Sequence, residues 1–281
     1  MADPRIAVIT GTTHGIGTVT SHDLARAGYT VVMLCRNVAA ANVLAQRIMQ
    51  GTAGSQVQVV HCDLADLSSV RAAAREVLSR FPRIDRLINN AGMVSTRHRF
   101  SVDGHELTFA TNHLGPFLLT RLLLPALAPA ARILYVASKV HYRGRMDLDT
   151  IDDPQARYSA IAAYARSKLA NVMDTFVLAR QLGGSGIGVN CLHPGLVATN
   201  LLPGWLNLLR PLFRRFIVSA EQGARTTRYL ALDDEAARFN GEYLDEHQRV
   251  QPAAAAAYDR AMQDQLLARS ARWTGLDQAD S

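Results

Sequence analysis

The chain has 281 residues, of which 48% are hydrophobic and 19% are charged, proportions typical of a globular α/β protein and too apolar for a disordered one. Its net charge of +6 comes almost entirely from arginines scattered over helix-like segments, which argues against a nucleic-acid-binding protein. No window approaches a length of about eighteen apolar residues without a charge or a helix breaker, so the sequence predicts no membrane span.

Apolar, β-prone runs alternate with helix-period stretches along most of the chain. The runs predict strands at residues 5–10, 30–35, 57–61, 86–89, 133–137, 188–192 and 241–244. The stretches predict helices at residues 16–27, 39–49, 68–80, 106–127, 159–182 and 220–232. Such alternation predicts a doubly wound α/β Rossmann fold, with a parallel sheet of about seven strands flanked by helices. No repeat or long linker divides the chain, which predicts a single domain over residues 1–281.

Three segments interrupt this alternation, at residues 97–105, 139–157 and 196–219. Loops that leave the carboxyl ends of parallel strands hold the ligands of such folds, so these segments are expected to build a substrate pocket. We interpret the segment 196–219 as a substrate lid, with weak contact of its apolar stretch 201–216 with a membrane surface, or a subunit interface there, as alternatives. The tail 253–281, helical over residues 253–272, is expected to cover either the pocket or a partner.

The start of the chain and its three cysteines indicate the compartment in which the protein works. Residues 1–5 lead into a strand-like run without the regions of a signal peptide. Cys35, Cys62 and Cys191 lie within or at the ends of apolar, β-prone runs. This placement predicts reduced thiols rather than disulfides or a metal site, and with them a cytoplasmic location.

A glycine-rich turn follows the first predicted strand and precedes the first predicted helix. Glycines let the backbone turn tightly and approach a pyrophosphate, whose charge is met by the amides at the start of the helix. The turn therefore predicts a dinucleotide site. Its contacts are expected at Gly11, Thr13, His14, Gly15, Ile16 and Gly17.

The second predicted strand ends at Cys35, followed by Arg36 and Asn37. Enzymes that choose NAD usually place a carboxylate here, on the ribose 2′-hydroxyl. The guanidinium of Arg36 instead suits a 2′-phosphate, so the sequence favours NADP(H) over NAD(H). The alternative interpretation is an exposed arginine in a turn.

Tyr164 and Lys168 lie four residues apart in the predicted helix 159–182, so that their side chains share one face. A free tyrosine has a pKa of about 10 and is a poor acid or base at neutral pH. A neighbouring ammonium lowers that pKa, which predicts an acid–base pair. The chain has only one other lysine, Lys139.

Seven motifs stand in a characteristic order along the chain. They are Thr10 to Gly17, Asp63, Asn89 to Gly92, Asn112, Ser138, Tyr164 with Lys168, and Pro194-Gly195 leading to Thr199. Together they resemble the short-chain dehydrogenase/reductase family over residues 4–245. Within it, the segment 138–141, the long gap from Ser138 to Tyr164 and the segment 111–120 resemble the retinol dehydrogenase group.

The resemblance implies the catalytic roles. Tyr164 exchanges the proton with the substrate, and Ser138 hydrogen-bonds the substrate oxygen and stabilises its developing charge. Lys168 lowers the tyrosine pKa and holds the nicotinamide ribose, and Asn112 positions a water in the proton relay.

The resemblance also implies the rest of the cofactor site. Asp63 binds the adenine amino group, Asn90 lies along the cofactor, and Thr199 holds the carboxamide. The remaining contacts implied are Asn37, Leu64, Ala91, Gly92, Pro194, Gly195 and Val197. No metal is implied.

These observations predict an NADP(H)-dependent oxidoreductase that moves a hydride between the nicotinamide and a carbonyl or alcohol of a small, bulky and apolar substrate, with reduction as the working direction. The alternative is an NADP(H)-binding regulatory protein without essential turnover. The resemblance further implies a homodimer or homotetramer, assembled through the predicted helices 106–127 and 159–182.

Overall fold

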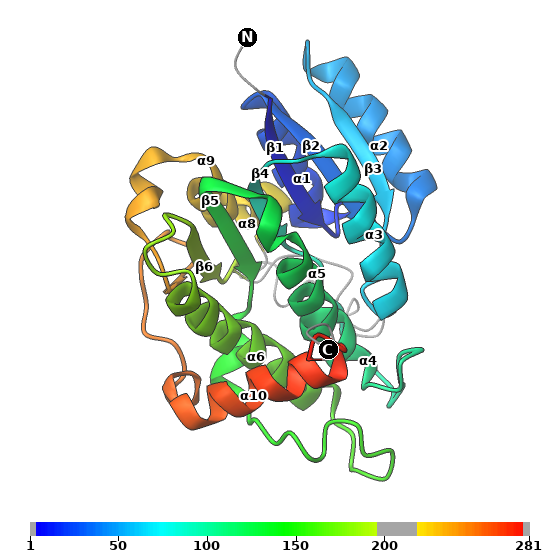
Figure 1. Ribbon diagram of the computed structural model, residues 1–281, viewed down its shortest axis with the longest axis vertical. Coiled ribbons are helices and arrows are strands. Elements are labelled where there is room, and N and C mark those ends of the chain that lie inside the picture. Colours follow the sequence, from blue (N-terminus) through cyan, green and yellow to red (C-terminus); the bar gives the residue numbers. More distant parts are fainter. Residues whose placement is uncertain (1–3, 196–217, 278–281) are drawn as a thin grey trace.

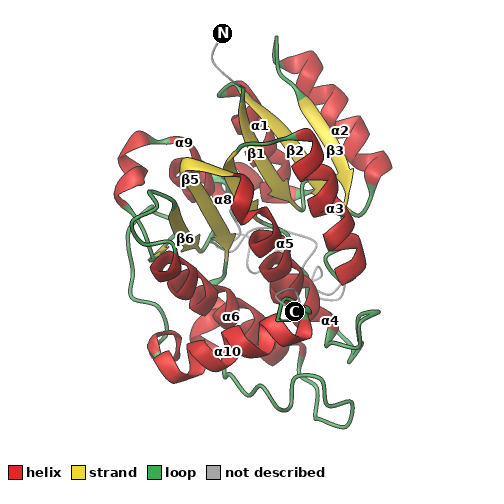
Figure 2. Cartoon of the chain, viewed as in Figure 1, coloured by secondary structure: helices red, strands yellow, loops and turns green. Residues whose placement is uncertain are grey.

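The computed structural model describes residues 4–195 and 218–277. Seven strands form one sheet in the order β3-β2-β1-β4-β5-β6-β7, and every neighbouring pair is parallel. Helices cover both faces of this sheet, as Figures 1 and 2 show. The strand order reverses direction between β1 and β4, which is the switch point where doubly wound sheets bind their ligands. The predicted Rossmann fold is confirmed.

The strands follow the predicted runs closely, except for β5. It begins at Leu127, six residues before the predicted start, because the chain continues past Pro129 and Ala130, whose φ is +63°, with a shift of register against β4. The strands are β1 (Arg5–Thr10), β2 (Tyr29–Cys35), β3 (Val57–His61), β4 (Ile84–Asn89), β5 (Leu127–Val136), β6 (Gly188–Leu192) and β7 (Glu242–Leu244).

Several of the helices that match a prediction begin at a residue whose side chain caps them. The Asn37 side chain accepts a hydrogen bond from the Ala40 amide, and Asp66 and Ser159 make equivalent caps at the helices that follow them. The helices are α1 (Gly15–Arg26), α2 (Val38–Gly51), α3 (Leu67–Arg80), α6 (Ala160–Gln181), α8 (Ala220–Gly223) and α9 (Arg225–Leu232).

The predicted helix 106–127 is not a continuous α-helix. It consists of α4 (Leu107–Phe109), a π-helix (Ala110–Leu114), α5 (Gly115–Leu123) and a 3₁₀ turn (Leu124–Ala126). Pro116 and Pro125 lack the amide that a continuous ladder of hydrogen bonds needs, and they stand at the start of the last two segments. Short π-helical insertions are frequent at functional sites, and this one contains Asn112.

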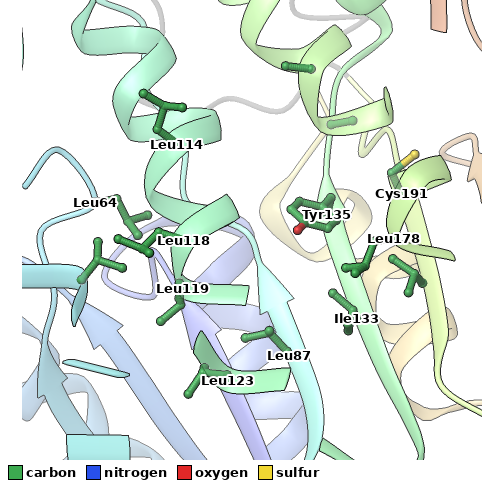
Figure 3. Close-up of a cluster of buried hydrophobic side chains, with 14 of the residues drawn as sticks. Leu64, Leu87, Leu114, Leu118, Leu119, Leu123, Ile133, Tyr135, Leu178 and Cys191 are labelled. Atoms are coloured by element: carbon green, nitrogen blue, oxygen red, sulfur yellow. The ribbon is translucent and has the colours of Figure 1, made fainter. Parts of the chain in front are cut away.

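Alternate strand residues point to opposite faces of the sheet and build two cores. On one face, Val8 and Leu87 pack with Leu118 of α5; on the other, Ile9 and Met33 pack with Leu24 of α1. Figure 3 shows the first core, where leucines 114, 118, 119 and 123 follow one another along the chain, the last two beside Leu87, and where Ile133 and Tyr135 of β5 lie nearby. The apolar strand runs are explained by this burial on both sides.

A buried ion pair joins α5, α6 and β5 inside the first core. Arg121 binds both carboxylate oxygens of Asp174, and the Tyr135 hydroxyl donates to the same carboxylate over 2.8 Å. The Arg121 and Asp174 side chains are 12% and 3% exposed. The charges are therefore paired and hydrogen-bonded, as burial of charge requires.

The C-terminal helix α10 (Arg260–Trp273) lies across α6, at the lower end of the view in Figure 1. Arg180 of α6 donates to Gln263, and His113 of the π-helix lies 3.0 Å from the Ser270 hydroxyl. The predicted helix 253–272 is shorter than expected, because Asp259 caps α10 and only a 3₁₀ turn (Ala255–Tyr258) precedes it.

The sequence predicts no membrane span, and reduced cysteines rather than disulfides or a metal site. Within residues 4–195 and 218–277, no helix combines the length and the apolar character of a membrane span. The same residues contain no group of three or more His, Cys, Asp or Glu side chains suited to a metal ion. Cys35, Cys62 and Cys191 are buried and free, as the sequence predicts.

Candidate active site

The glycine-rich turn between β1 and α1 is held close to the helix that it precedes. Gly11 and Gly15 have φ values of +69° and +57°, in the left-handed region that favours glycine. A Cβ on Gly17 would lie 2.2 Å from the Gly11 carbonyl oxygen, so only glycine fits there. His14 occupies the N-cap position of α1 without a capping hydrogen bond from its side chain. The first amides of α1 are therefore free to bind an anionic group such as a pyrophosphate.

Asn90 supports this turn from the end of β4. Its amide nitrogen donates to the carbonyls of Thr10 and Gly11 over 2.9 and 3.0 Å, and Thr10 Oγ accepts from the backbone amides of Asn90 and Ala91. A Cβ on Gly11 would lie 2.7 Å from Ala91 Cα. Asn90 and Ala91 therefore hold the glycine-rich turn in the shape in which it is expected to contact the cofactor.

Arg36 and Asp63 follow the ends of β2 and β3, two neighbouring strands. Arg36 is exposed, and Asn37 beside it caps α2. One Asp63 carboxylate oxygen accepts from the Ala65 amide over 3.0 Å. Leu64 is buried, and its carbonyl would lie 2.4 Å from a Cβ on Gly115. The residues expected to bind the adenine half of a dinucleotide therefore stand together at one sheet edge.

Tyr164, Lys168 and Ser138 meet beyond the ends of β4 and β5. The Lys168 ammonium lies 5.6 Å from the centre of the Tyr164 ring and donates to the Val136 carbonyl over 2.7 Å. The Ser138 side chain lies close enough to the Tyr164 hydroxyl to lower its pKa. A Cβ on Gly92 would lie 3.2 Å from the same ammonium, so the segment after β4 closes over it. The predicted triad of side chains is thus assembled in one place.

Burial is the largest influence on the pKa values of Tyr164 and Lys168. It raises the pKa of Tyr164 to about 12, against the opposing effect of the Ser138 hydrogen bond, and it lowers the pKa of Lys168 to about 8. The expected lowering of the phenol pKa by Lys168 is therefore not present in this structure. Its ammonium is itself desolvated and is held by a backbone carbonyl.

Asn112 lies in the π-helix, and its side chain is fully hydrogen-bonded. Its oxygen accepts from the Met93 amide over 2.8 Å, and its nitrogen donates to the Met93 carbonyl and to Ser167 Oγ of α6. The backbone carbonyl of Asn112 accepts from Asn171 of α6. Asn112 therefore fixes the segment after β4 against α6, beside the triad.

Two histidines, which the sequence did not single out, hold the peptide bond that follows Ser138. His141 Nδ1 lies 2.7 Å from the Ser138 carbonyl oxygen, and the Lys139 amide donates to His193 Nδ1 over 3.1 Å. These are the two polar groups of one peptide unit. Both rings are buried. In the sequence, only their positions could have indicated this role: His141 stands three residues after Ser138, and His193 directly precedes Pro194.

The backbone partners fix the proton on His141. Its Nδ1 must donate, because a carbonyl can only accept, and its Nε2 must accept, because it faces the Ala254 amide at 3.1 Å. On His193, Nδ1 must accept from the Lys139 amide, which leaves Nε2 protonated, 3.8 Å from Glu246. We call this arrangement the histidine clamp: His141 and His193 on the Ser138–Lys139 peptide. Both rings must be neutral for it to form.

The clamp predicts a loss of stability in acid. Burial lowers the pKa of His193 to about 4 and also lowers that of His141, whereas an unfolded histidine titrates near 6.5. Between these values the unfolded chain binds more protons, so the free energy of unfolding falls as the pH falls from about 6.5 to about 4, by at most about 3 kcal/mol for His193. Urea unfolding over this range measures the slope.

A matched variant separates the clamp from general acid sensitivity. His193→Asn keeps an acceptor near the position of Nδ1 and removes the titrating ring, so its stability profile should be flatter than that of the wild type. Equal slopes in the two proteins would show that His193 does not contribute.

Pro194 and Gly195 end the segment after β6, where Gly195 has a φ of +83°. The predicted contacts Val197 and Thr199, and all of the predicted lid except residues 218 and 219, lie outside the described residues. Apart from these two, the predicted site residues follow the carboxyl ends of six strands, β1 to β6, or lie in the π-helix and α6.

Comparisons with known proteins agree with this arrangement. The model of the short chain dehydrogenase family matches residues 5–206. The human protein "Retinol dehydrogenase 13" is 38% identical over 283 residues, which cover 97% of this chain and 85% of the relative. The Bos taurus protein "Dehydrogenase/reductase SDR family member 13" is 41% identical, with coverages of 92% and 70%.

Solved structures give the same answer. An uncharacterized protein from Mycobacterium Paratuberculosis has a TM-score of 0.79 at 36% identity, over 96% of this chain and 93% of its own. A short chain dehydrogenase from Shigella flexneri, complexed with NADP, has a TM-score of 0.68 at 25% identity, with coverages of 86% and 97%. The chain belongs to the short-chain dehydrogenase/reductase family, where it is similar to the retinol dehydrogenases, and it is a nicotinamide-dependent oxidoreductase.

Proposed function

We propose that the chain is an NADP(H)-dependent reductase of bulky, apolar aldehydes or ketones. The observation that carries the proposal is the meeting of Tyr164, Ser138 and Lys168 beside the glycine-rich turn. The turn fits a dinucleotide, because the space at Gly17 excludes a side chain and the first amides of α1 are uncapped. When bound, the reduced nicotinamide supplies a hydride to the carbonyl carbon.

The residues of the chain supply the proton and the orientation. Ser138 donates a hydrogen bond to the carbonyl oxygen, where negative charge develops. Tyr164 then donates its phenolic proton to this oxygen. A pKa of about 12 keeps the phenol protonated at neutral pH, which suits a proton donor and therefore favours reduction. Lys168 binds the nicotinamide ribose and places its positive charge beside the phenol.

The apolar substrate is supported by two observations. Ile161 precedes Tyr164 by about one helical turn, lies on the same side of α6 and is 65% exposed, so the side of α6 that carries Tyr164 also exposes an apolar side chain. The names of several relatives specify retinol, an apolar alcohol. A panel of carbonyl compounds of increasing size and hydrophobicity, followed by NADPH absorbance, tests the proposal. Turnover confined to small, charged carbonyls would contradict it.

The preference for NADP(H) rests on Arg36, which is exposed at the end of β2 where a carboxylate would otherwise select NAD. Arg36→Gln should raise the KM for NADPH roughly tenfold or more and leave the KM for NADH almost unchanged, because only NADPH carries the phosphate. Steady-state kinetics with both cofactors measure the difference.

The control for this experiment is Arg47→Gln, which removes another exposed arginine of the same sheet edge, on α2. It should change neither KM. Faster turnover of the wild type with NADH than with NADPH would contradict the proposed preference, without affecting the assignment of the triad.

A further inference from the structure

A cavity of about 450 Å³ lies beside the first turns of α6, under the segment 143–159. It is separate from the triad. Ala162 and Arg166 line it, whereas Tyr164 and Lys168 are each two residues away and therefore about 200° around the helix. A molecule in this cavity meets the opposite side of α6 from the catalytic group.

The lining of the cavity is strongly basic. Four guanidinium groups line it, and the carboxylate of Asp147 is the one acidic group among its lining residues. The four arginines are Arg143, Arg145, Arg157 and Arg166. The cluster thus keeps a large excess of positive charge around a space that holds a small molecule.

These guanidiniums have no anionic partner within the described part of the chain. Arg269, by contrast, pairs with Asp149 of the same segment. None of the four takes part in an ion pair or a side-chain hydrogen bond between described residues, and the Nε of Arg166 is buried without an acceptor. A buried donor without a partner is costly, so a ligand group that accepts a hydrogen bond from it would be stabilised there.

Two carboxylates near Arg166, those of Glu106 and Asp152, already accept hydrogen bonds from other groups. Glu106 accepts from the amides of Thr108 and Phe109, and Asp152 accepts from the Glu106 amide and binds His105 over 2.7 Å. Burial lowers the pKa of Arg166 in spite of these acidic neighbours. The charge of Arg166 is therefore incompletely neutralised by the protein.

We propose that this cavity binds a small organic polyanion, with phosphate or carboxylate groups held by Arg143, Arg145, Arg157 and Arg166. The planar guanidinium fork matches both groups with two parallel hydrogen bonds. The stacked rings of His98 and Tyr158, whose centres are 4.8 Å apart, form an apolar part of the same wall and suit the body of such a molecule. This proposal does not rest on the proposed reductase function.

The experiment is a calorimetric titration of the full chain, saturated with NADPH so that the glycine-rich turn is occupied, with inorganic pyrophosphate, and with citrate, at constant ionic strength. Both polyanions should bind, and acetate, a monoanion, should bind far more weakly. Arg166→Gln should weaken binding about tenfold or more, because it removes a charge-assisted pair. Arg157→Gln should also weaken polyanion binding. Because Arg157 is exposed, this variant replaces Arg166→Gln in the test if Arg166→Gln does not fold.

Two variants distinguish this site from the expected cofactor site. Arg36→Gln and Arg47→Gln remove arginines outside the cavity and should leave pyrophosphate binding unchanged. If Arg36→Gln abolishes it and the cavity variants do not, the anion binds where the cofactor phosphate is expected, and the proposal is wrong. Equal binding to the wild type and both cavity variants would also overturn it.

Discussion

Replacing Tyr164 by phenylalanine should lower kcat/KM for carbonyl reduction by a factor of roughly 10² to 10⁴, the usual contribution of a positioned acid. The substitution removes one hydroxyl, the proposed proton donor beside Ser138. The Lys168 ammonium keeps its bond to the Val136 carbonyl, and the glycine-rich turn is not touched. NADPH affinity, measured by fluorescence titration, should therefore stay nearly unchanged.

Tyr229→Phe is the matched control, because it deletes the same hydroxyl from a tyrosine of α9, away from the triad. It should have wild-type kinetics. If Tyr164→Phe retained full turnover, the proton would come from another group. If Tyr164→Phe left the biological role intact in a cell that depends on this protein, the NADP(H)-binding regulatory protein would become the better interpretation.

His141→Gln should lower kcat about tenfold to a hundredfold with a smaller change in KM. The glutamine amide reaches the position of Nε2 and can still accept from the Ala254 amide, but nothing remains at Nδ1 to donate to the Ser138 carbonyl. A buried carbonyl without a donor costs about 1–3 kcal/mol, and the backbone that presents Ser138 moves to find one. Each 1.4 kcal/mol of lost transition-state stabilisation is about tenfold in rate.

His141→Asn is the complementary variant. The asparagine amide lies near the position of Nδ1 and can donate to the Ser138 carbonyl, while the Ala254 amide loses its acceptor. Both variants should be destabilised to a similar degree in thermal unfolding, but His141→Asn should keep most of kcat. Equal losses of kcat in the two variants would show that His141 acts only through stability.

The sequence contained most of the fold, because the strands are buried on both faces and their apolar residues are consecutive. The run from Ile6 to Ile9 is an example. The start of β5 was missed, since Pro129 normally ends a strand, and only pairing with β4 shows that the strand continues around it. The same limit explains the helix 106–127, where apolar periodicity continues through a π-helix that periodicity cannot reveal.

The site was predictable to the extent that spacing along one helix or order along the chain defines it. Tyr164 and Lys168 share a face of α6 by their spacing, and this geometry is observed. The pKa of Tyr164 was not predictable, because it depends on how deeply the fold buries the phenol. His193 was not predictable for a similar reason: it meets Lys139 only because β5 and β6 are neighbours.

The position of α10 bears on how copies of this chain could associate. Gln263 and Ser270 connect α10 to α6 and to the π-helix, and Arg71 of α3 donates to the Thr274 and Gly275 carbonyls just beyond its end. Because α10 covers these sides of α6 and of the π-helix, they cannot contact a second copy of the chain in a symmetric dimer. A second copy that approached along these helices would meet the outward face of α10 first, so the residues of that face, rather than those of α6, would determine the affinity of such a dimer.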